Sequence, residues 1–468
     1  MSTHDDGISR RKFLGQATCA GFGLSGLLST MGTLRLFNAT LSAQGVPDDS
    51  KALVCLFLFG GNDGNNMVVP YDTAGYNAYA AARGILALPR TNLLPLATPG
   101  GDGRQFALHP SLPLLRNVYN NGRMAVVANV GTLVAPITKA EYQSGGAAVP
   151  PYLFSHNDQQ VQWQTSVPDS PKKVGWGGRL ADLLQSLNEG SQVSMNISLA
   201  GNNFFQVGNE VFQYHVSSNG SIGLNEYTAT WTPRKETYGG LRDTLGLSYS
   251  HLFESEYANI TNRAIANDTL LKATLVSIPT YTEKFPHCVV GTGLSRLGGQ
   301  LRMILRLISA QQSLGMKRQI FFCSMGGFDT HDDQLNDHAA LMTELDNAMA
   351  DFHQATVDLG VAEKVTLFTA SDFNRTFSTN GKGSDHAWGS HQIVTGGAVQ
   401  GGRMFGAMPV LQANGPDDTG SRGSWIPTTS GDEYSATLAR WFGVQEGDLP
   451  LVLPNIGRFA RPNLGFMG

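Results

Sequence analysis

The sequence predicts an α/β fold with a mostly parallel central sheet, and two patterns support this. Continuous apolar runs of strand length, each ended by glycine or serine, indicate strands that are buried on both faces, as in parallel sheets. In the C-terminal half these runs alternate with apolar residues at helical spacing, which is typical of helix–strand alternation. The chain has 468 residues, of which 41% are hydrophobic, so it can fill a large core and is not a disordered protein.

The expected elements follow from these patterns in chain order. Strands are expected at 52–59, 124–130, 193–199, 319–323 and 365–370, and helices at 294–308 and 335–352. The segment from about 200 to 290 is rich in Asn, Ser, Thr and Tyr and lacks strong periodicity. We expect this segment to be a loop-rich insertion or cap within a single domain that spans 44–468.

The N-terminus predicts export. Ser9-Arg10-Arg11-Lys12-Phe13-Leu14 precedes a moderately apolar run and resembles a twin-arginine (Tat) signal. The alternative is a chance arginine pair before a buried helix. We expect residues 1–43 to be removed as the signal, with the Tat translocase as a partner during export. The protein would then be periplasmic or secreted, with no stable membrane span after cleavage.

Composition excludes two classes of protein. The chain has 37 acidic against 33 basic residues and no basic block, so nucleic acid is not an expected partner. No interior stretch approaches the roughly 20 apolar residues of a membrane-spanning helix, so a multi-span membrane protein is excluded. Cys55 and Cys323 lie inside apolar strand-like runs and are expected to be small core residues.

Three expected strands are followed by an acidic residue. These residues are Asp63, Asp329 and Asp372. In open α/β sheets, ligands bind at the carboxyl ends of the strands, so residues far apart in sequence can meet there. Each acid taken alone is better explained as a turn residue or a helix cap. Three of them together favour a shared site.

Histidines lie close to two of these acids. His331 follows Asp329 by two residues, and His386 and His391 follow a Gly-rich loop after Asp372. Several carboxylates in one cleft would repel one another, and a divalent cation removes that cost. Mixed Asp/His ligation suits Zn, Mn or Fe, whereas oxygen-dominated ligation suits Mg or Ca. The alternative is that His386 and His391 are loop histidines hydrogen-bonded to backbone.

Five motifs distributed over about residues 52–402 carry a family resemblance. They are Phe59–Asn66, Leu153–Gln160, Gly326–His331, Ser371–Thr376 and Gly383–His386. With them, the chain resembles a Tat-exported domain-of-unknown-function family within the alkaline phosphatase/sulfatase-like superfamily. That resemblance implies a three-layer α/β/α sandwich, one or two divalent metal ions (Zn, Mn, Ca or Mg), and a hydroxyl nucleophile that attacks phosphorus or sulfur.

The resemblance also implies a set of metal ligands. Carried over position by position, the ligands are Asp63, Asp329, His331, Asp372 and His386, with His391 as a further candidate. Two departures from the superfamily pattern stand out. The superfamily spaces the middle pair as D-x-x-x-H, whereas this chain has Asp329-Thr330-His331, and Phe373 stands where a histidine commonly follows the later acid. These departures are compatible with one metal ion or with no hydrolytic activity.

The predicted nucleophile is Ser155, because Ser155-His156-Asn157-Asp158 is typical of a loop that enters a helix. Backbone amides at a helix start favour an oxyanion or a phosphate, and a nearby metal lowers the pKa of a hydroxyl. The alternative is that Ser155 only caps that helix, with Asp158 as its partner. Thr132, which follows the strand at 124–130, is a second candidate nucleophile.

Arg375 is the predicted clamp for an anionic substrate, because guanidinium matches the geometry of phosphate or sulfate. The alternative is a salt bridge that tethers its loop. Together these residues predict an exported metal-dependent hydrolase of phosphate or sulfate esters, acting on an anionic small molecule or a glycan ester. The competing hypothesis is a non-catalytic envelope or polysaccharide-binding protein on the same scaffold, and a transferase acting on envelope glycans stays open.

Overall fold

The computed structural model describes residues 49–97, 103–224 and 233–468. The expected signal at 1–43 lies outside these residues. Within the described part of the chain, no helix combines the length and the apolar character needed to cross a membrane.

Strand β1 (Lys51–Leu58) is the centre of the main sheet. It pairs in parallel with β11 (Arg318–Met325) on one side and with β12 (Val365–Ser371) on the other. Its residues alternate between two cores. Val54, Leu56 and Leu58 pack into the core on one face, and Leu53, Cys55 and Phe57 pack into the core on the other. Burial on both faces explains why this strand is a continuous apolar run instead of an alternating one.

The other strands extend the sheet in both directions. They are β5 (Met124–Gly131), β6 (Asn196–Ser198), β7 (Tyr214–Ser217), β8 (Gly220–Ser221), β13 (Ser390–Gly396), β14 (Arg403–Phe405) and β15 (Thr429–Ser430). The order across the sheet is β14-β5-β13-β12-β1-β11-β6-β7-β8, with β15 paired to β5. Among the described strands of this sheet, β8 and β13 pair antiparallel with their neighbours, and the others pair in parallel. The described sheet is therefore mostly parallel, as predicted.

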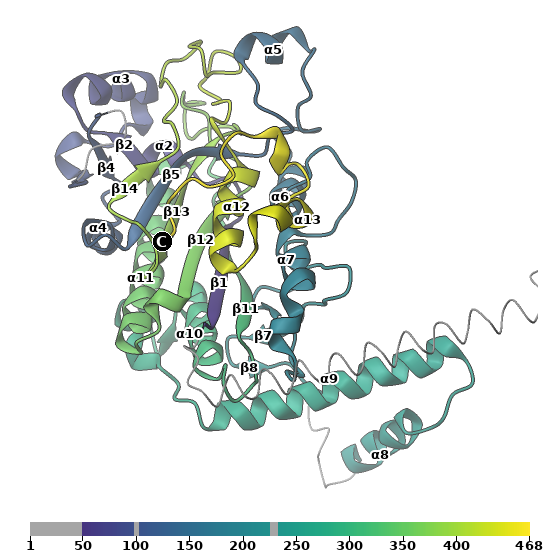
Figure 1. Ribbon diagram of the computed structural model, residues 1–468. Coiled ribbons are helices and arrows are strands. Elements are labelled where there is room, and N and C mark those ends of the chain that lie inside the picture. The colour runs from purple at the N-terminus through teal and green to yellow at the C-terminus, as the bar shows by residue number, and fades with distance from the viewer. Residues whose placement is uncertain (1–48, 98–102, 225–232) are drawn as a thin grey trace, which may run out of the picture. The chain divides into compact units, whose positions relative to one another are not determined.

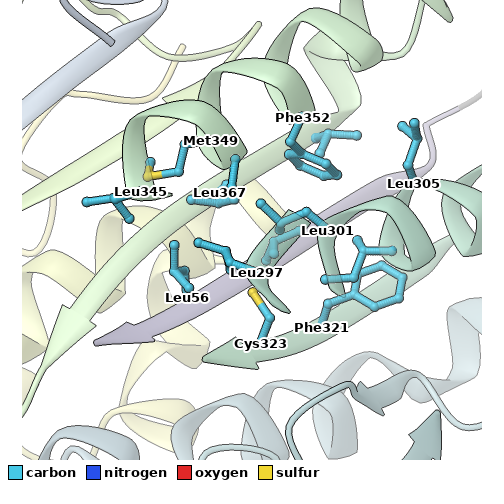
Figure 2. Packing of buried hydrophobic residues seen from close by; sticks show 14 of the residues in the cluster. Leu56, Leu297, Leu301, Leu305, Phe321, Cys323, Leu345, Met349, Phe352 and Leu367 are labelled. Carbon is cyan, nitrogen blue, oxygen red and sulfur yellow. The ribbon is translucent and has the colours of Figure 1, made fainter. Parts of the chain in front are cut away.

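Helices cover both faces of this sheet (Figure 1). On one face lie α10 (Arg296–Ser309) and α11 (Gln334–Asp358), whose apolar residues pack against Leu56 and Leu367 of the strands (Figure 2). On the other face lie α7 (Trp176–Leu184), α12 (Gly431–Phe442) and α13 (Leu449–Val452). This layering confirms the predicted α/β fold with flanking helices.

Two parts of the fold differ from the expectation. Strand β13 was not predicted, because Ser390–Gly396 is a mixed polar and apolar segment without a continuous run. The segment 200–290 is more helical than the loop-rich insertion that was expected, since it holds α8 (Arg234–Leu245) and the 25-residue α9 (Leu252–Val276). Of the residues in α9, only Ala258, Leu271 and Leu275 are buried. A helix with so little buried surface needs no apolar stripe, which explains why its sequence shows no clear amphipathic pattern.

Shorter elements complete the described chain. A small antiparallel sheet, in the order β2-β4-β3, joins Val68–Pro70, Phe106–Leu108 and Leu94–Pro95. The remaining helices are α2 (Gly64–Met67), α3 (Thr73–Arg83), α4 (Pro113–Asn120), α5 (Lys139–Ser144) and α6 (His156–Thr165), and β9 (Val289–Val290) pairs with β10 (Gly293–Leu294). Of these, α2, α3 and α6 matter most here, because they bring side chains to the carboxyl end of the main sheet.

Candidate functional site

The loops that follow β1, β11 and β12 meet at one rim, because the three strands are parallel neighbours. Gly60 has a φ of +114°, and a Cβ built on it would lie 2.4 Å from the backbone nitrogen of Asp329. Its own amide donates to Asp372 Oδ2 at 3.2 Å. Glycine at position 60 therefore lets the loops that carry Asp329 and Asp372 approach each other.

Three imidazole nitrogens converge on one oxygen of Asp329. Its Oδ1 lies 3.0 Å from Nε2 of His331, 3.4 Å from Nε2 of His156 and 3.4 Å from Nε2 of His386. The Nε2 atoms of His331 and His386 are 3.0 Å apart. The structure thus brings together two segments that follow β11 and β12 and a third, His156, from the start of α6.

These separations fit a bound cation. Metal–ligand bonds of about 2.0 Å to nitrogen and oxygen place the ligands of a tetrahedral ion about 3.3 Å apart. Ligand atoms of His156, Asp329 and His386 all lie within 4.8 Å of one another, and His331 is at 3.0 Å from two of these residues. Within the described part of the chain, His156, Asp329 and His386 are thus the residues that could share one ion, and His331 contacts two of them. We call these four residues the His3Asp cluster (His156, Asp329, His331, His386).

The ring of His156 is held by a hydrogen bond on its Nδ1 side. Its Nδ1 lies 2.7 Å from Asp372 Oδ2, and this hydrogen bond raises the pKa of His156 against the opposing effect of desolvation. Its Nε2 is a buried atom that has no hydrogen-bond partner among the described residues. A buried nitrogen without a partner that faces a carboxylate is the kind of atom that a metal ion would satisfy.

His386 is held in a similar way. Its Nδ1 donates to the backbone oxygen of Phe154 at 2.7 Å, which directs Nε2 toward Asp329. Burial lowers the pKa of His386, so the ring is neutral near pH 7. A neutral imidazole is the form that binds a metal.

Arg375 is buried on the protein side of Asp329 and makes an ion pair with it. Its side chain is fully buried, and Nη1 donates to Asp329 Oδ1 at 2.8 Å. Although desolvation acts to raise it, the hydrogen bond and charge of Arg375 hold the pKa of Asp329 below its usual value. Arg375 thus keeps Asp329 ionised and oriented. The role of substrate clamp stays a prediction, for which a fully buried guanidinium gives no support.

The hydrogen bonds and the ion pair of Asp63 and His391 described next are made with residues outside the His3Asp cluster. Asp63 is fully buried, forms an ion pair with Arg83 of α3, and accepts from Gln334 and from the backbone of Asn65. Nδ1 of His391 accepts from the backbone of Asn129 at 3.1 Å, and burial lowers the pKa of His391 to about 4. Neither residue contacts the His3Asp cluster through these bonds, and their assignment as metal ligands stays a prediction.

The two candidate nucleophiles have different surroundings. Ser155 is the N-cap residue of α6, and its hydroxyl donates to Asp158 Oδ2 at 2.6 Å instead of bonding to the helix backbone. The hydroxyl of Thr132 is buried and donates to Gln159 Oε1 at 2.8 Å. Of the two, Ser155 is half-buried, next in sequence to a cluster residue, and paired with a carboxylate that can accept a proton.

His156 was not among the ligands predicted from the sequence. The signal was present, since His156 follows Ser155 in one of the family motifs, and Phe373 occupies a position where a histidine was expected. The two observations become linked only in the structure, where the rings of His156 and Phe373 lie 4.7 Å apart.

Comparison with known proteins gives a partial family match. A family model described as a protein of unknown function (DUF1501) matches residues 301–420. This range contains Asp329, His331, Asp372 and His386 but not His156. A search of curated proteins found no match.

Several solved structures are similar to the chain at low identity. The lipoteichoic acid synthase LtaP from Listeria monocytogenes is 10% identical, with 87% of this chain and 76% of that chain covered and a TM-score of 0.33. The PsFucS1 sulfatase from Pseudoalteromonas sp. is 10% identical, with coverages of 90% and 72% and a TM-score of 0.34. The phosphonate monoester hydrolase SpPMH from Silicibacter pomeroyi is 8% identical, with coverages of 85% and 74% and a TM-score of 0.33.

Proposed function

We propose that the protein is a metal-dependent hydrolase of phosphate or sulfate esters. The observation that carries the proposal is the convergence of three histidine nitrogens on Asp329 Oδ1 at distances of 3.0–3.4 Å. The cluster lies at the carboxyl end of parallel strands, which is where α/β sheets bind their ligands. Export by the Tat route and a periplasmic or secreted location belong to the same proposal and rest on residues 1–43.

The donor set narrows the choice of metal. Three imidazoles with one carboxylate favour zinc or a similar transition-metal ion over magnesium or calcium, which prefer oxygen ligands. One ion is enough for this cluster, since Asp63 is engaged by Arg83. When bound, such an ion supplies a Lewis acid that polarises an ester oxygen and lowers the pKa of a coordinated hydroxyl or water.

The cluster is open to a substrate on one side, and neighbouring residues orient its ligands. The side chains of Asp329 and His331 are 48% and 43% exposed, so one side of the cluster is open to a substrate. Arg375 balances the charge of Asp329 and fixes its orientation. In the proposal, Ser155 is the nucleophile and Asp158 accepts its proton, because their hydrogen bond of 2.6 Å is the geometry of an activated hydroxyl.

The burial of Arg375 favours a second candidate function. A fully buried arginine cannot present a cationic clamp at the surface of the site, and such a clamp is a common means of holding a phosphate or sulfate ester. A non-catalytic envelope or polysaccharide-binding protein would not need one. This second candidate predicts a folded protein that binds metal or glycan but hydrolyses no ester.

The test combines metal analysis with a substrate panel on the full-length protein. We expect close to one equivalent of zinc or a similar ion by elemental analysis, and saturable hydrolysis of an aryl phosphate, phosphonate or sulfate ester. His386→Ala should lose both the metal and at least 100-fold in kcat/KM. His287→Ala is the matched control, because His287 is 52% exposed and its ring pairs with Asp351, outside the cluster.

Two outcomes would count against the hydrolase. Metal binding without turnover on the whole panel would favour the non-catalytic candidate. Equal activity in the wild type, His386→Ala and His287→Ala would place any observed hydrolysis outside this cluster.

A further inference from the structure

Asp372 is fully buried, and its Oδ2 atom is the acceptor for three donors. His156 Nδ1 lies 2.7 Å away, Gln160 Nε2 donates at 2.9 Å, and the amide of Gly60 donates at 3.2 Å. His156 and Gln160 are four residues apart on α6, so they lie on the same face of that helix. One carboxylate therefore joins the first turn of α6 to the loop that follows β1.

The ring of His156 has a defined orientation because of this contact. A carboxylate can only accept, so the hydrogen of the neutral imidazole must be on Nδ1. The lone pair is then on Nε2, the atom that faces Asp329 Oδ1 at 3.4 Å. Carboxylates that hold a metal-binding histidine in this way fix both its tautomer and the direction of its ring.

Phe373, the residue after Asp372, completes the pocket of this ring. The centroid of the His156 ring lies 4.7 Å from that of Phe373 and 4.4 Å from that of His386. The segment after β12 thus carries a phenyl ring where an imidazole was expected, and α6 brings an imidazole from another part of the chain against that phenyl ring.

We propose that Asp372 is a positioning residue for His156 and not a metal ligand, and that His156 supplies the imidazole that is missing at position 373. The inference rests on the metal centre of the proposed function. Neither Asp372 nor His331 belongs to the group of His156, Asp329 and His386 whose ligand atoms lie within 4.8 Å of one another. Asp372 meets that group through Oδ2, which contacts Nδ1 of His156 at 2.7 Å, while its Oδ1 is buried without a hydrogen-bond partner among the described residues. In this proposal, Asp372 affects metal binding only by orienting the ring of His156 through their hydrogen bond.

The first readout is made on the metal-free, full-length protein. Selective ¹⁵N labelling of histidine, with the signal assigned by a His156→Gln variant, reports which ring nitrogen carries the hydrogen. At a pH high enough to keep the ring of His156 neutral, we expect the Nδ1–H tautomer in the wild type. Asp372→Asn keeps an acceptor at the same place and should retain this tautomer, whereas Asp372→Leu removes the acceptor and should give a mixture of tautomers.

The second readout is the affinity for zinc alone, measured by competition with a chromophoric chelator. Changes in residues that orient a metal ligand cost about 10–100-fold in affinity. We expect about a 10-fold loss in Asp372→Asn and about a 100-fold loss in Asp372→Leu, while Asp329→Ala, which removes a ligand, should bind no zinc at micromolar concentrations. Far-UV circular dichroism checks that each variant is folded. If Asp372→Leu does not fold, Asp372→Asn still carries the test.

Two results would overturn the inference. If Asp372→Asn abolished zinc binding as completely as Asp329→Ala, Asp372 would be a ligand. If the tautomer of His156 in the wild type were Nε2–H, or if zinc affinity in Asp372→Asn and in any folded Asp372→Leu stayed within twofold of wild type, Asp372 would not position the ring. The expected tautomer and affinities without any ester hydrolysis would instead contradict only the proposed function.

Discussion

Asp63, a predicted metal ligand, forms a buried ion pair with Arg83. Both side chains are fully buried, and removing one partner of such a pair costs about 3–5 kcal/mol because the other charge is left uncompensated. We predict that Asp63→Ala lowers the free energy of unfolding by about 3 kcal/mol, measured by urea denaturation. In the folded fraction, zinc affinity should stay within a few-fold of wild type. Loss of zinc without loss of stability would make Asp63 a ligand instead.

Asp432, in the first turn of α12, predicts a pH dependence of stability. Burial raises the pKa of Asp432 to about 7, although Ser166 and Arg179 act to lower it. Between about pH 4 and pH 7 the folded state keeps this proton while the unfolded state has released it. Stability contributed by the protonated form is therefore lost as the pH rises through this window, by at most about 1.4 kcal/mol per pH unit.

The measurement for Asp432 is urea denaturation of wild type and Asp432→Asn from pH 4 to pH 8. We expect the variant to gain stability relative to wild type as the pH rises, because asparagine carries no charge to bury. A constant difference between the two proteins across this range would contradict the assignment.

At the scale of elements, the loop after β1 depends on Gly60. Alanine there combines a φ of +114° with a Cβ 2.4 Å from the backbone nitrogen of Asp329. We predict that Gly60→Ala displaces Asp329 and weakens zinc binding at least 10-fold. Gly122→Ala is the matched control, since Gly122 also has a positive φ, +74°, but nothing lies within 4 Å of its Cβ position. Equal zinc affinity in the two variants would show that the close approach is not needed.

The two halves of α9 are predicted to differ in their contribution to stability. Leu271 is fully buried in the core that contains α10 and α11, whereas Ile260 is 53% exposed. Leu271→Ala should lower the free energy of unfolding by about 2–5 kcal/mol through lost burial and a cavity, and Ile260→Ala by less than about 0.5 kcal/mol. Equal midpoints in urea for the two variants would contradict this division of the helix.

For the whole molecule, metal binding should appear as thermal stability. A ligand that binds only the folded state adds about 2.7 kcal/mol at a concentration of 100 times its Kd. We predict that zinc raises Tm by a few degrees over chelator-treated protein in differential scanning calorimetry. His386→Ala should show no such difference. A shift that persists in this variant would indicate a different metal site.

Much of the fold followed from local pattern. The predicted strands at 52–59, 124–130, 319–323 and 365–370 correspond to β1, β5, β11 and β12, because burial on both faces requires continuous apolar runs. β13 was missed because polar residues interrupt it. α9 was missed because a helix with few buried residues has no apolar stripe to detect.

The candidate site was only partly visible in the sequence. Asp329, His331 and His386 were recognisable because strand-end acids and nearby histidines are local features. That these residues meet His156 could not be predicted from the sequence, because it depends on where α6 packs against the end of β12. The same holds for Arg375, whose burial behind Asp329 is a property of the assembled loops.

By itself, the sequence determined the alternation of helices and strands, the apolar runs that form the buried strands, and the acids at the ends of the strands. These are consequences of periodicity and of short-range chemistry. Only the tertiary structure decided that Asp63 pairs with Arg83, that Asp372 holds His156, and that three histidines surround Asp329. The physical reason is that the partner of a buried polar group is set by which distant segments become neighbours, and a hydrogen bond between residues more than 200 positions apart leaves no periodic trace in the chain.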